Sequence, residues 1–172
     1  CIYYNFSCFN IAHSVQLSET TIGTTTYDLQ SNASLQDRII MHDDGTISAV
    51  WTMSQALNTS FSDRGTGYNF FDGTSWGAQP TTRLESSRGG WPSIIKMGSG
   101  KEAAVTHNTT NSHVNMTHRA VTGTGTWTEQ NISSMNDSTG IYRDMIWNRT
   151  VSGGANNESL HMIAVTASTN FG

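Results

Sequence analysis

The chain has 172 residues, a formal net charge of −4 at pH 7 and only 13% charged residues, while 21 Ser and 24 Thr supply most of its uncharged polar side chains. The length suits one domain, or a part of one larger domain. The scarcity of Lys and Arg excludes a nucleic-acid binder, no apolar run is long enough for a membrane span, and the aromatic content excludes a disordered chain.

The first 21 residues are predicted to form an N-terminal extension. Residues 2–17 are apolar and aromatic, and they could add a strand to a neighbouring subunit or to their own domain. Because the chain begins at Cys1 and not at Met, we expect a mature, trimmed or partial form. Cys1 and Cys8 could form a disulfide across a turn in an oxidising compartment. The alternatives are two free buried thiols and, for Cys1, a bacterial lipid anchor.

Apolar and polar side chains alternate along much of the chain, and helical periodicity is nearly absent. This pattern predicts half-buried strands over residues 46–53 and 113–121, and a more fully buried strand over residues 160–166. Hairpin turns are predicted at Asp44-Gly45, Asp72-Gly73 and Gly123-Thr124-Gly125. The fold class is therefore predicted to be all-β.

An internal repeat of about 50 residues runs through this alternation. The pattern of residues 37–50 returns in residues 92–105, and a third copy with an insertion is predicted over residues 142–165. A unit of this size matches a four-stranded propeller blade, with a stacked β-solenoid as the alternative. The predicted domain spans residues 22–172 and contains about three propeller-like repeats of four-stranded antiparallel sheets, incomplete or completed by a neighbouring chain, over residues 36–88, 89–140 and 141–172.

Several stretches of this domain share one resemblance: residues 22–34, Arg38-Ile39-Ile40, residues 44–51, Asp63–Tyr68 and Asp72–Gly77. Together they resemble the start of the secreted sialidase-like β-propeller proteins of Bacteroidetes, which carry Asp-box-type turns. The resemblance extends from about Ile22 to Ala167. It implies a secreted β-propeller, in a group whose members are typically much longer and end in a sorting domain.

The resemblance also implies one candidate site residue. Arg38-Ile39-Ile40 is similar to the sialidase Arg-Ile-Pro motif, whose Arg holds the substrate carboxylate, although Ile40 replaces the proline. A retaining sialidase also needs a Tyr nucleophile, a carboxylate partner and two more arginines. The available residues are Tyr27, Tyr68, Tyr142, Asp63 and Glu102, and their spacing does not choose among them. A ladder or salt-bridge role for Arg38 is favoured over catalysis.

N-glycosylation sequons are unusually frequent. Composition alone would give about four, whereas the chain contains nine. They begin at Asn5, Asn32, Asn58, Asn108, Asn115, Asn131, Asn136, Asn148 and Asn157. We therefore expect a glycan-bearing secreted protein, with sequon formation by composition alone as the alternative.

Other residues with chemical potential favour structural roles. His107, His113 and His118 are close in sequence, but His113 and His118 face opposite sides of one strand, so no metal site is predicted. Asp43-Asp44-Gly45 lacks the spaced oxygen ligands of a calcium loop. The five tryptophans are expected to wedge between sheets, with stacking on sugar rings as the alternative.

These observations together predict a non-catalytic, secreted, glycosylated β-repeat protein at the cell surface or outside the cell. Three blades leave at least one sheet flank open, so we expect homo-oligomers or filaments in a structural or adhesive role. The alternative is a sialidase-like glycoside hydrolase, or a glycan-binding module. No cofactor is predicted.

Overall fold

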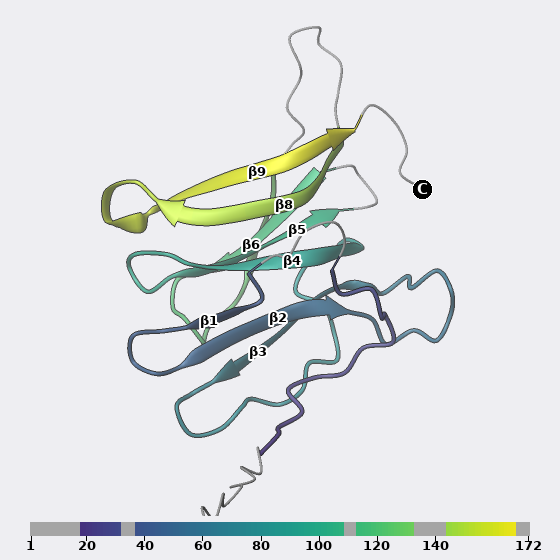
Figure 1. Ribbon diagram of the computed structural model, residues 1–172, viewed down its shortest axis with the longest axis horizontal. Helices are drawn as coiled ribbons and strands as arrows, with labels where there is room; N and C mark the ends of the chain where they lie inside the picture. The colour runs from purple at the N-terminus through teal and green to yellow at the C-terminus, as the bar shows by residue number, and fades with distance from the viewer. Residues whose placement is uncertain (1–17, 32–36, 109–112, 133–143, 168–172) are drawn as a thin grey trace, which may run out of the picture.

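Three antiparallel sheets lie one above another in the computed structural model (Figure 1). The structure describes residues 18–31, 37–108, 113–132 and 144–167. Its elements are β1 Ile39–Met41, β2 Ile47–Met53, β3 Gly65–Phe71, β4 Gly89–Lys96, β5 Glu102–Asn108, β6 His113–Arg119, β7 Thr128–Ile132, β8 Asp144–Gly153, the 3-10 turn η1 Ala155–Asn157 and β9 Ser159–Ala167. The all-β prediction is confirmed. Within the described ranges, no helix is long and apolar enough to cross a membrane.

Each sheet falls within one of the three predicted repeats. The first has the order β1-β2-β3, the second β4-β5-β6-β7 and the third β8-β9. Only the second has the four strands predicted for every repeat. In the first sheet an isolated bridge between Phe71 and Trp76 takes the place of a fourth strand. The sheets of the described residues do not close into a barrel or a propeller.

Strands β4 and β5 of the middle sheet are buried on both faces. Toward the first sheet, Ile94 and Ala104 pack against Val50. Toward the third sheet, Ile95 and Val105 pack with Met145 and neighbouring apolar side chains. Because successive residues of a strand point to opposite faces, β5 separates two apolar layers, and all seven of its residues are buried.

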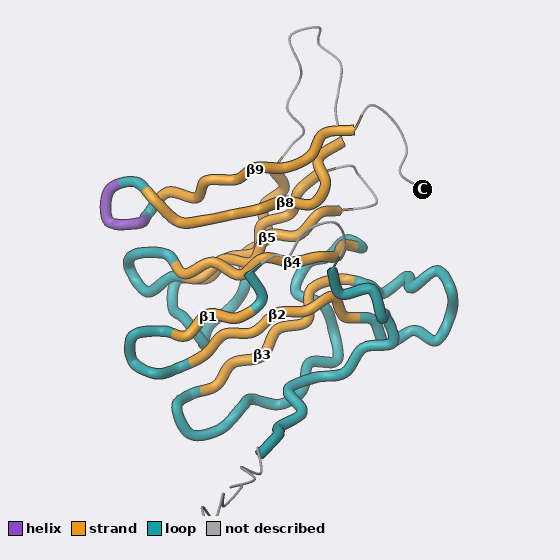
Figure 2. Tube along the Cα trace, in the orientation of Figure 1, coloured by secondary structure: helices purple, strands orange, loops and turns teal. Residues whose placement is uncertain are grey.

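The first hairpin turns of the three sheets lie in one column at the left of the view in Figure 2. Exposed ion pairs connect successive turns, from Lys96 to Asp43 at 2.7 Å and from Lys101 to Glu158 at 2.8 Å. The Gly98 amide also donates to the Asn157 carbonyl at 3.0 Å. These contacts hold the three hairpins at the same height along their strands.

A β-bulge recurs at the same place in the second and third sheets. Trp91 in β4 and Trp147 in β8 have φ angles of 52° and 51°, in the left-handed region that tryptophan rarely occupies. At each bulge two residues oppose one, because the pairing shifts between Gly90 and Ser93 and between Ile146 and Arg149. The bulges therefore align Trp147 in β8 with Trp91 in β4.

The strand predicted over residues 160–166 exists as β9, but its predicted burial is wrong. Leu160, Met162 and Ala164 pack toward the middle sheet, whereas Ile163 and Val165 on the other face are 78% and 49% exposed. The side chains of β9 suit a strand covered on both faces, but the described residues provide a layer on only one of them.

Residues 18–31 run beside the first sheet: Gly23 lies on the face opposite the middle sheet, whereas Tyr27 reaches Trp91 of β4. A Cβ at Gly23 would lie 2.0 Å from the Trp51 ring, so only glycine permits this approach. The Asn69 side chain donates to the Ile22 carbonyl at 2.6 Å, and the Thr26 amide to the Ser54 carbonyl at 2.8 Å. Residues 1–17, with the predicted disulfide partners Cys1 and Cys8, lie outside the described residues.

Candidate functional site

The best-connected polar cluster of the described residues lies between the first and middle sheets and centres on Glu102, the first residue of β5. This carboxylate is fully buried. It accepts hydrogen bonds from the Ser48 hydroxyl at 2.8 Å, the Tyr68 hydroxyl at 3.0 Å and the Gly123 amide at 3.0 Å. It also forms a buried ion pair with Arg119. Donors from both sheets therefore occupy both of its oxygens.

Arg119, in β6, provides the positive charge of this Glu102 cluster and stacks on its aromatic rings. Its guanidinium carbon lies 4.7 Å from the centre of the Tyr68 ring and 4.4 Å from that of Trp127. The two rings meet edge to face at 5.1 Å. Stacking on aromatic rings and pairing with a carboxylate both stabilise an arginine side chain in a buried site.

The cluster brings together two residues that sequence reasoning left unpaired, Tyr68 and Glu102. Tyr68 has the carboxylate partner that a tyrosine nucleophile needs. A nucleophile also needs a lowered pKa, however, and the pKa of Tyr68 is raised. Burial, together with the negative charge of Glu102, raises the pKa of Tyr68 above its ordinary value. The phenol therefore stays protonated and donates a hydrogen bond to Glu102. The cluster is suited to tethering two sheets and not to nucleophilic attack.

Sequence reasoning did not single out Arg119 or Ser48, and it considered Trp127 only as one of the five tryptophans expected to wedge between sheets. A signal for the cluster was present, because Glu102 shares a strand face with Ala104, which belongs to a buried apolar layer. A carboxylate on such a face requires a buried counter-charge. Its identity depends on the pairing of Glu102 with Arg119 across β5 and β6, which no local pattern shows.

A second arginine between aromatic rings lies where residues 18–31 meet the middle sheet. Arg64 stacks on Tyr27 at 4.8 Å and on Trp91 at 4.6 Å, and its Nε donates to the Gly89 carbonyl at 2.8 Å. The His107 ring lies 4.7 Å from Trp91. Burial, helped by the charges of Arg64 and Arg88, lowers the pKa of His107 to about 4. His107 is therefore a neutral core histidine.

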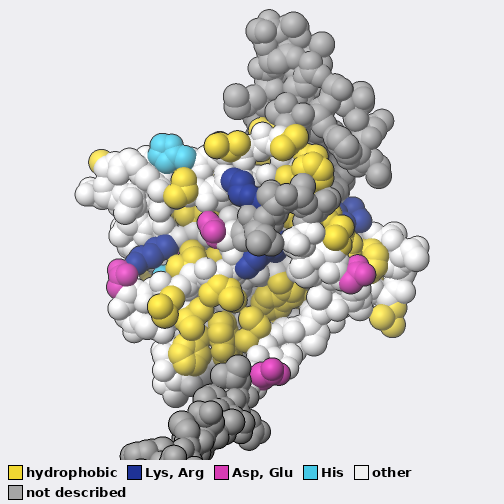
Figure 3. Space-filling view, viewed as in Figure 1, with side chains coloured by type: hydrophobic (Ala, Val, Ile, Leu, Met, Phe, Trp, Pro, Cys, Tyr) yellow, Lys and Arg dark blue, Asp and Glu magenta, His cyan; other side chains and the backbone are white. Residues whose placement is uncertain are grey.

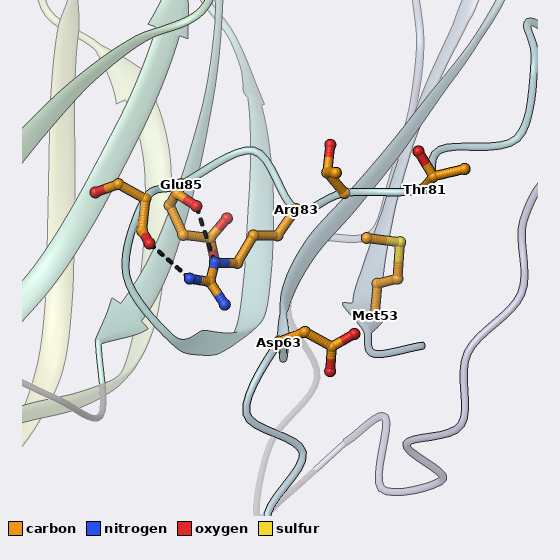
Figure 4. A pocket seen from close by; sticks show the side chains of 7 residues that line it. Met53, Asp63, Thr81, Arg83 and Glu85 are labelled. Carbon is orange, nitrogen blue, oxygen red and sulfur yellow. Dashed lines mark hydrogen bonds between the residues drawn. The ribbon is translucent and has the colours of Figure 1, made fainter. Parts of the chain in front are cut away.

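A pocket of about 350 Å³ opens beside these elements (Figure 4). Its lining residues are Met53, Asp63, Thr81, Thr82, Arg83, Glu85 and Ser86. Glu85 is only 2% exposed and accepts from the Thr66 amide and hydroxyl, and burial raises its pKa to about 7. Arg83 folds over it and donates to the carbonyls of Glu85 and Ser86 at 3.0 and 2.6 Å. The Glu85 carboxyl thus seals the wall of the pocket.

Asp63, the second carboxylate of this pocket, is also bound to its own chain. It accepts from the Ser54 hydroxyl at 2.5 Å and from the amides of Gln55 and Ala56 at 2.7 and 3.0 Å. Burial favours a higher pKa for Asp63, but these hydrogen bonds outweigh it and lower the pKa. Two carboxylates with pKa values moved apart suit acid–base chemistry, but here protein donors already engage both.

Arg38, the residue singled out by the sialidase resemblance, lies just before β1 and is half-buried. Its Nη2 donates to the Gln30 carbonyl. Burial and the positive charge of Arg149, in β8, lower the pKa of Arg38 to about 10. Arg149 has a buried Nη2 with no hydrogen-bond partner among the residues that the structure describes. Arg38 and Arg149 therefore repel each other electrostatically, at a place separate from the Glu102 cluster.

The structure separates the sequons into two groups. Asn108, Asn115 and Asn148 are buried, and each of their amides donates a hydrogen bond inside the protein, to Asn115, Glu129 and Val105, respectively. An attached glycan is incompatible with these positions. The exposed sequon asparagines are Asn58, Asn131 and Asn157, whereas Asn5, Asn32 and Asn136 lie outside the described residues.

The remaining candidates have structural surroundings. None of the five tryptophans is exposed. His113 and His118 lie in β6 without a register shift between them, so they face opposite sides of the strand. Within the part of the chain that the structure describes, no three His, Cys, Asp or Glu side chains gather as a metal site would require. Tyr142 lies outside the described residues.

Comparison with known proteins identifies no relative: no protein-family model, curated protein or solved structure matches the chain.

Proposed function

We propose that this protein is a non-catalytic, secreted β-repeat subunit with a structural or adhesive role outside the cell. One observation carries the proposal. The only described tyrosine that donates to a carboxylate within hydrogen-bond distance, Tyr68, is in a cluster that joins two sheets, with its acceptor Glu102 fully buried. If Tyr68 and Glu102 acted in catalysis, they would have to leave this interface. Arg119 would then remain buried without its counter-charge.

Composition and surface support the extracellular part of the proposal. The chain carries few charges and many hydroxyl groups, and three sequon asparagines, Asn58, Asn131 and Asn157, have exposed side chains. The proposed glycosylation narrows to these three positions and to the three sequons outside the described residues. Intact mass before and after enzymatic removal of N-glycans, from a eukaryotic secretory host, tests this: Asn108, Asn115 and Asn148 are expected to be unmodified.

The proposed architecture is a propeller-like succession of repeats, in line with the resemblance to sialidase-like proteins. Its support is that successive sheets pack in the same sense, with Val50 of one repeat and Val105 of the next each facing the following sheet. Repeats that pack only on their neighbours are typical of proteins built as scaffolds.

Turnover of a fluorogenic sialoside tests the absence of catalysis. We expect the wild-type protein to give no more product than the Glu102→Gln and Arg38→Ala variants. Turnover by the wild type that Arg38→Ala abolishes would contradict the proposal. A genuine sialidase of another fold serves as the positive control for substrate and buffer.

A second candidate function is the binding of acidic glycans, favoured by the Arg38–Arg149 pair. Two neighbouring arginines with an unsatisfied Nη2 on Arg149 suit a carboxylate ligand. Titration with sialyllactose and with neutral lactose separates the possibilities. Saturable binding of the acidic sugar alone, lost in Arg149→Gln, would support this candidate, and equal responses to both sugars would reject it.

A further inference from the structure

The recurring tryptophan bulge gives an exact residue correspondence between the middle and third sheets. The first residue pair after the bulge is Ser93 with Val105 in the middle sheet and Arg149 with Ile163 in the third. Ile163 therefore corresponds to Val105. Ile95 and Val151 each lie two residues beyond the start of that pairing, so these two residues also correspond.

These corresponding residues differ in burial. In the middle sheet Ile95 and Val105 are 4% and 0% exposed, because the third sheet packs on them. In the third sheet Val151 and Ile163 are 60% and 78% exposed. We call the side of the β8–β9 hairpin that carries Val151, Ile163 and Val165 the forward face. The corresponding surfaces of the first and middle sheets are each covered by the next sheet.

The opposite end of the stack carries the complementary surface. Ile39 and Met41 of β1 are 66% and 74% exposed on the side of the first sheet that faces away from the middle sheet. In the sequence repeat, Ile39 corresponds to Ile94, which packs against Val50 of the preceding sheet. We call the exposed surface at Ile39 and Met41 the back face. Residues 18–31 cover the sheet at Trp51, and so confine the back face to the part near β1.

Figure 3 shows hydrophobic side chains over both end sheets of the stack, the lower sheet β1–β3 and the upper hairpin β8–β9. Among the described residues, the packing of a forward side on a back side thus occurs twice, and one forward face and one back face remain uncovered. A large exposed apolar surface on a protein marks an interaction site.

We propose that the forward face of β8–β9 binds the back face of β1–β3 in a second copy of this chain. This contact between two copies has the same packing as the contacts between successive sheets within one copy. It is heterologous, so each added copy again presents a free forward face, and the product is a filament or, if the rotation closes, a ring. This inference deepens the proposed structural role and rests on it.

The test uses two full-length variants, each blocked on one face. Ile163→Asp, with Val151→Asp as a second choice, places a charge on the forward face, and Ile39→Asp does so on the back face. Leu57→Asp is the matched control, because Leu57 is 94% exposed but lies on a loop away from both faces. Circular dichroism and thermal unfolding verify that each variant folds.

Sedimentation velocity over a hundredfold concentration range is the measurement. We expect the weight-average mass of the wild type and of Leu57→Asp to rise at least twofold, and each face variant to remain monomeric. An equimolar mixture of the two face variants is expected to form a dimer and nothing larger, because only one intact pair of faces remains.

A wild type that stays monomeric throughout, or folded face variants that assemble as the wild type does, would overturn the inference. Neither result depends on hydrolysis or on glycan binding. A monomeric wild type that also lacks sialoside turnover would therefore reject the assembly and leave the non-catalytic assignment in place.

Discussion

The buried charged side chains of the Glu102 cluster are paired with each other and with nearby hydroxyl groups. Glu102 and Arg119 neutralise each other between two sheets, and Tyr68 and Ser48 complete the hydrogen bonds of the carboxylate. A buried pair of this kind contributes little compared with apolar packing, but losing one member is costly because the other charge remains buried. The cluster therefore fixes how the first sheet sits on the middle sheet.

Glu102→Gln tests this role. The substitution leaves the Arg119 guanidinium buried without its counter-charge, and we expect the free energy of unfolding to fall by about 3–5 kcal/mol. Chemical denaturation at neutral pH measures the change. The control is Glu158→Gln, which removes the exposed ion pair with Lys101 and should leave the unfolding midpoint unchanged. Equal effects of the two substitutions would refute a structural role for the cluster.

Glu85 predicts a dependence of stability on pH. Its pKa is about 7 in the folded protein and about 4.5 when unfolded, so the folded state binds the extra proton between these values. Its stabilising contribution is complete below pH 4.5 and disappears as the pH rises through 7, a change on the order of 3 kcal/mol.

Glu85→Gln should remove this contribution and flatten the decline in stability between pH 4.5 and 7. Thermal unfolding in a series of buffers measures the slope, with the exposed Glu19→Gln as control. A variant whose slope equals that of the wild type would show that the Glu85 carboxyl is not desolvated as described.

At the scale of strands and turns, the sequence predicted what depends on local pattern. The strands β2 and β6 and the Asp44-Gly45 hairpin follow from two-residue alternation and from the positive φ that Gly45 supplies. Features that depend on contacts between sheets were not predictable. These include the bulges at Trp91 and Trp147, the reduction of the first sheet to three strands, and the burial of the Asn108, Asn115 and Asn148 amides.

The same limit applied to the candidate site. Tyr68 and Glu102 stood among five possible residues; the packing of the first sheet on the middle sheet was needed to choose them, and the pairing of β5 with β6 to add Arg119. Arg38 was predicted from a motif, and its neighbour Arg149 comes from β8, in another sheet.

The stacked turns give a prediction for a single element. A Cβ at Gly98 would lie 1.5 Å from the Asn156 carbonyl oxygen, so Gly98→Ala must separate the turns of the middle and third sheets. We expect the free energy of unfolding to fall by about 1–3 kcal/mol. Gly45→Asn is the control, because that site has φ 83° and open space, and asparagine tolerates this conformation. Loss of stability in the control alone would contradict the packing of these turns.

At the scale of the molecule, the protein is a short stack with unlike ends. The middle sheet has both faces covered, whereas the two outer sheets each keep one apolar surface at which the same packing could continue. A stack of this kind obtains its stability from neighbouring layers, so the order of burial along it should be visible in solution.

Amide hydrogen exchange of the full-length wild type at two concentrations, a hundredfold apart, tests the central claim most directly. The account predicts that β5 is the most protected strand at both concentrations, and that β9 gains protection at the higher one as another copy covers its forward face. If β5 exchanges as fast as β9, the stack is contradicted. If protection of β9 is independent of concentration, assembly through that face is contradicted.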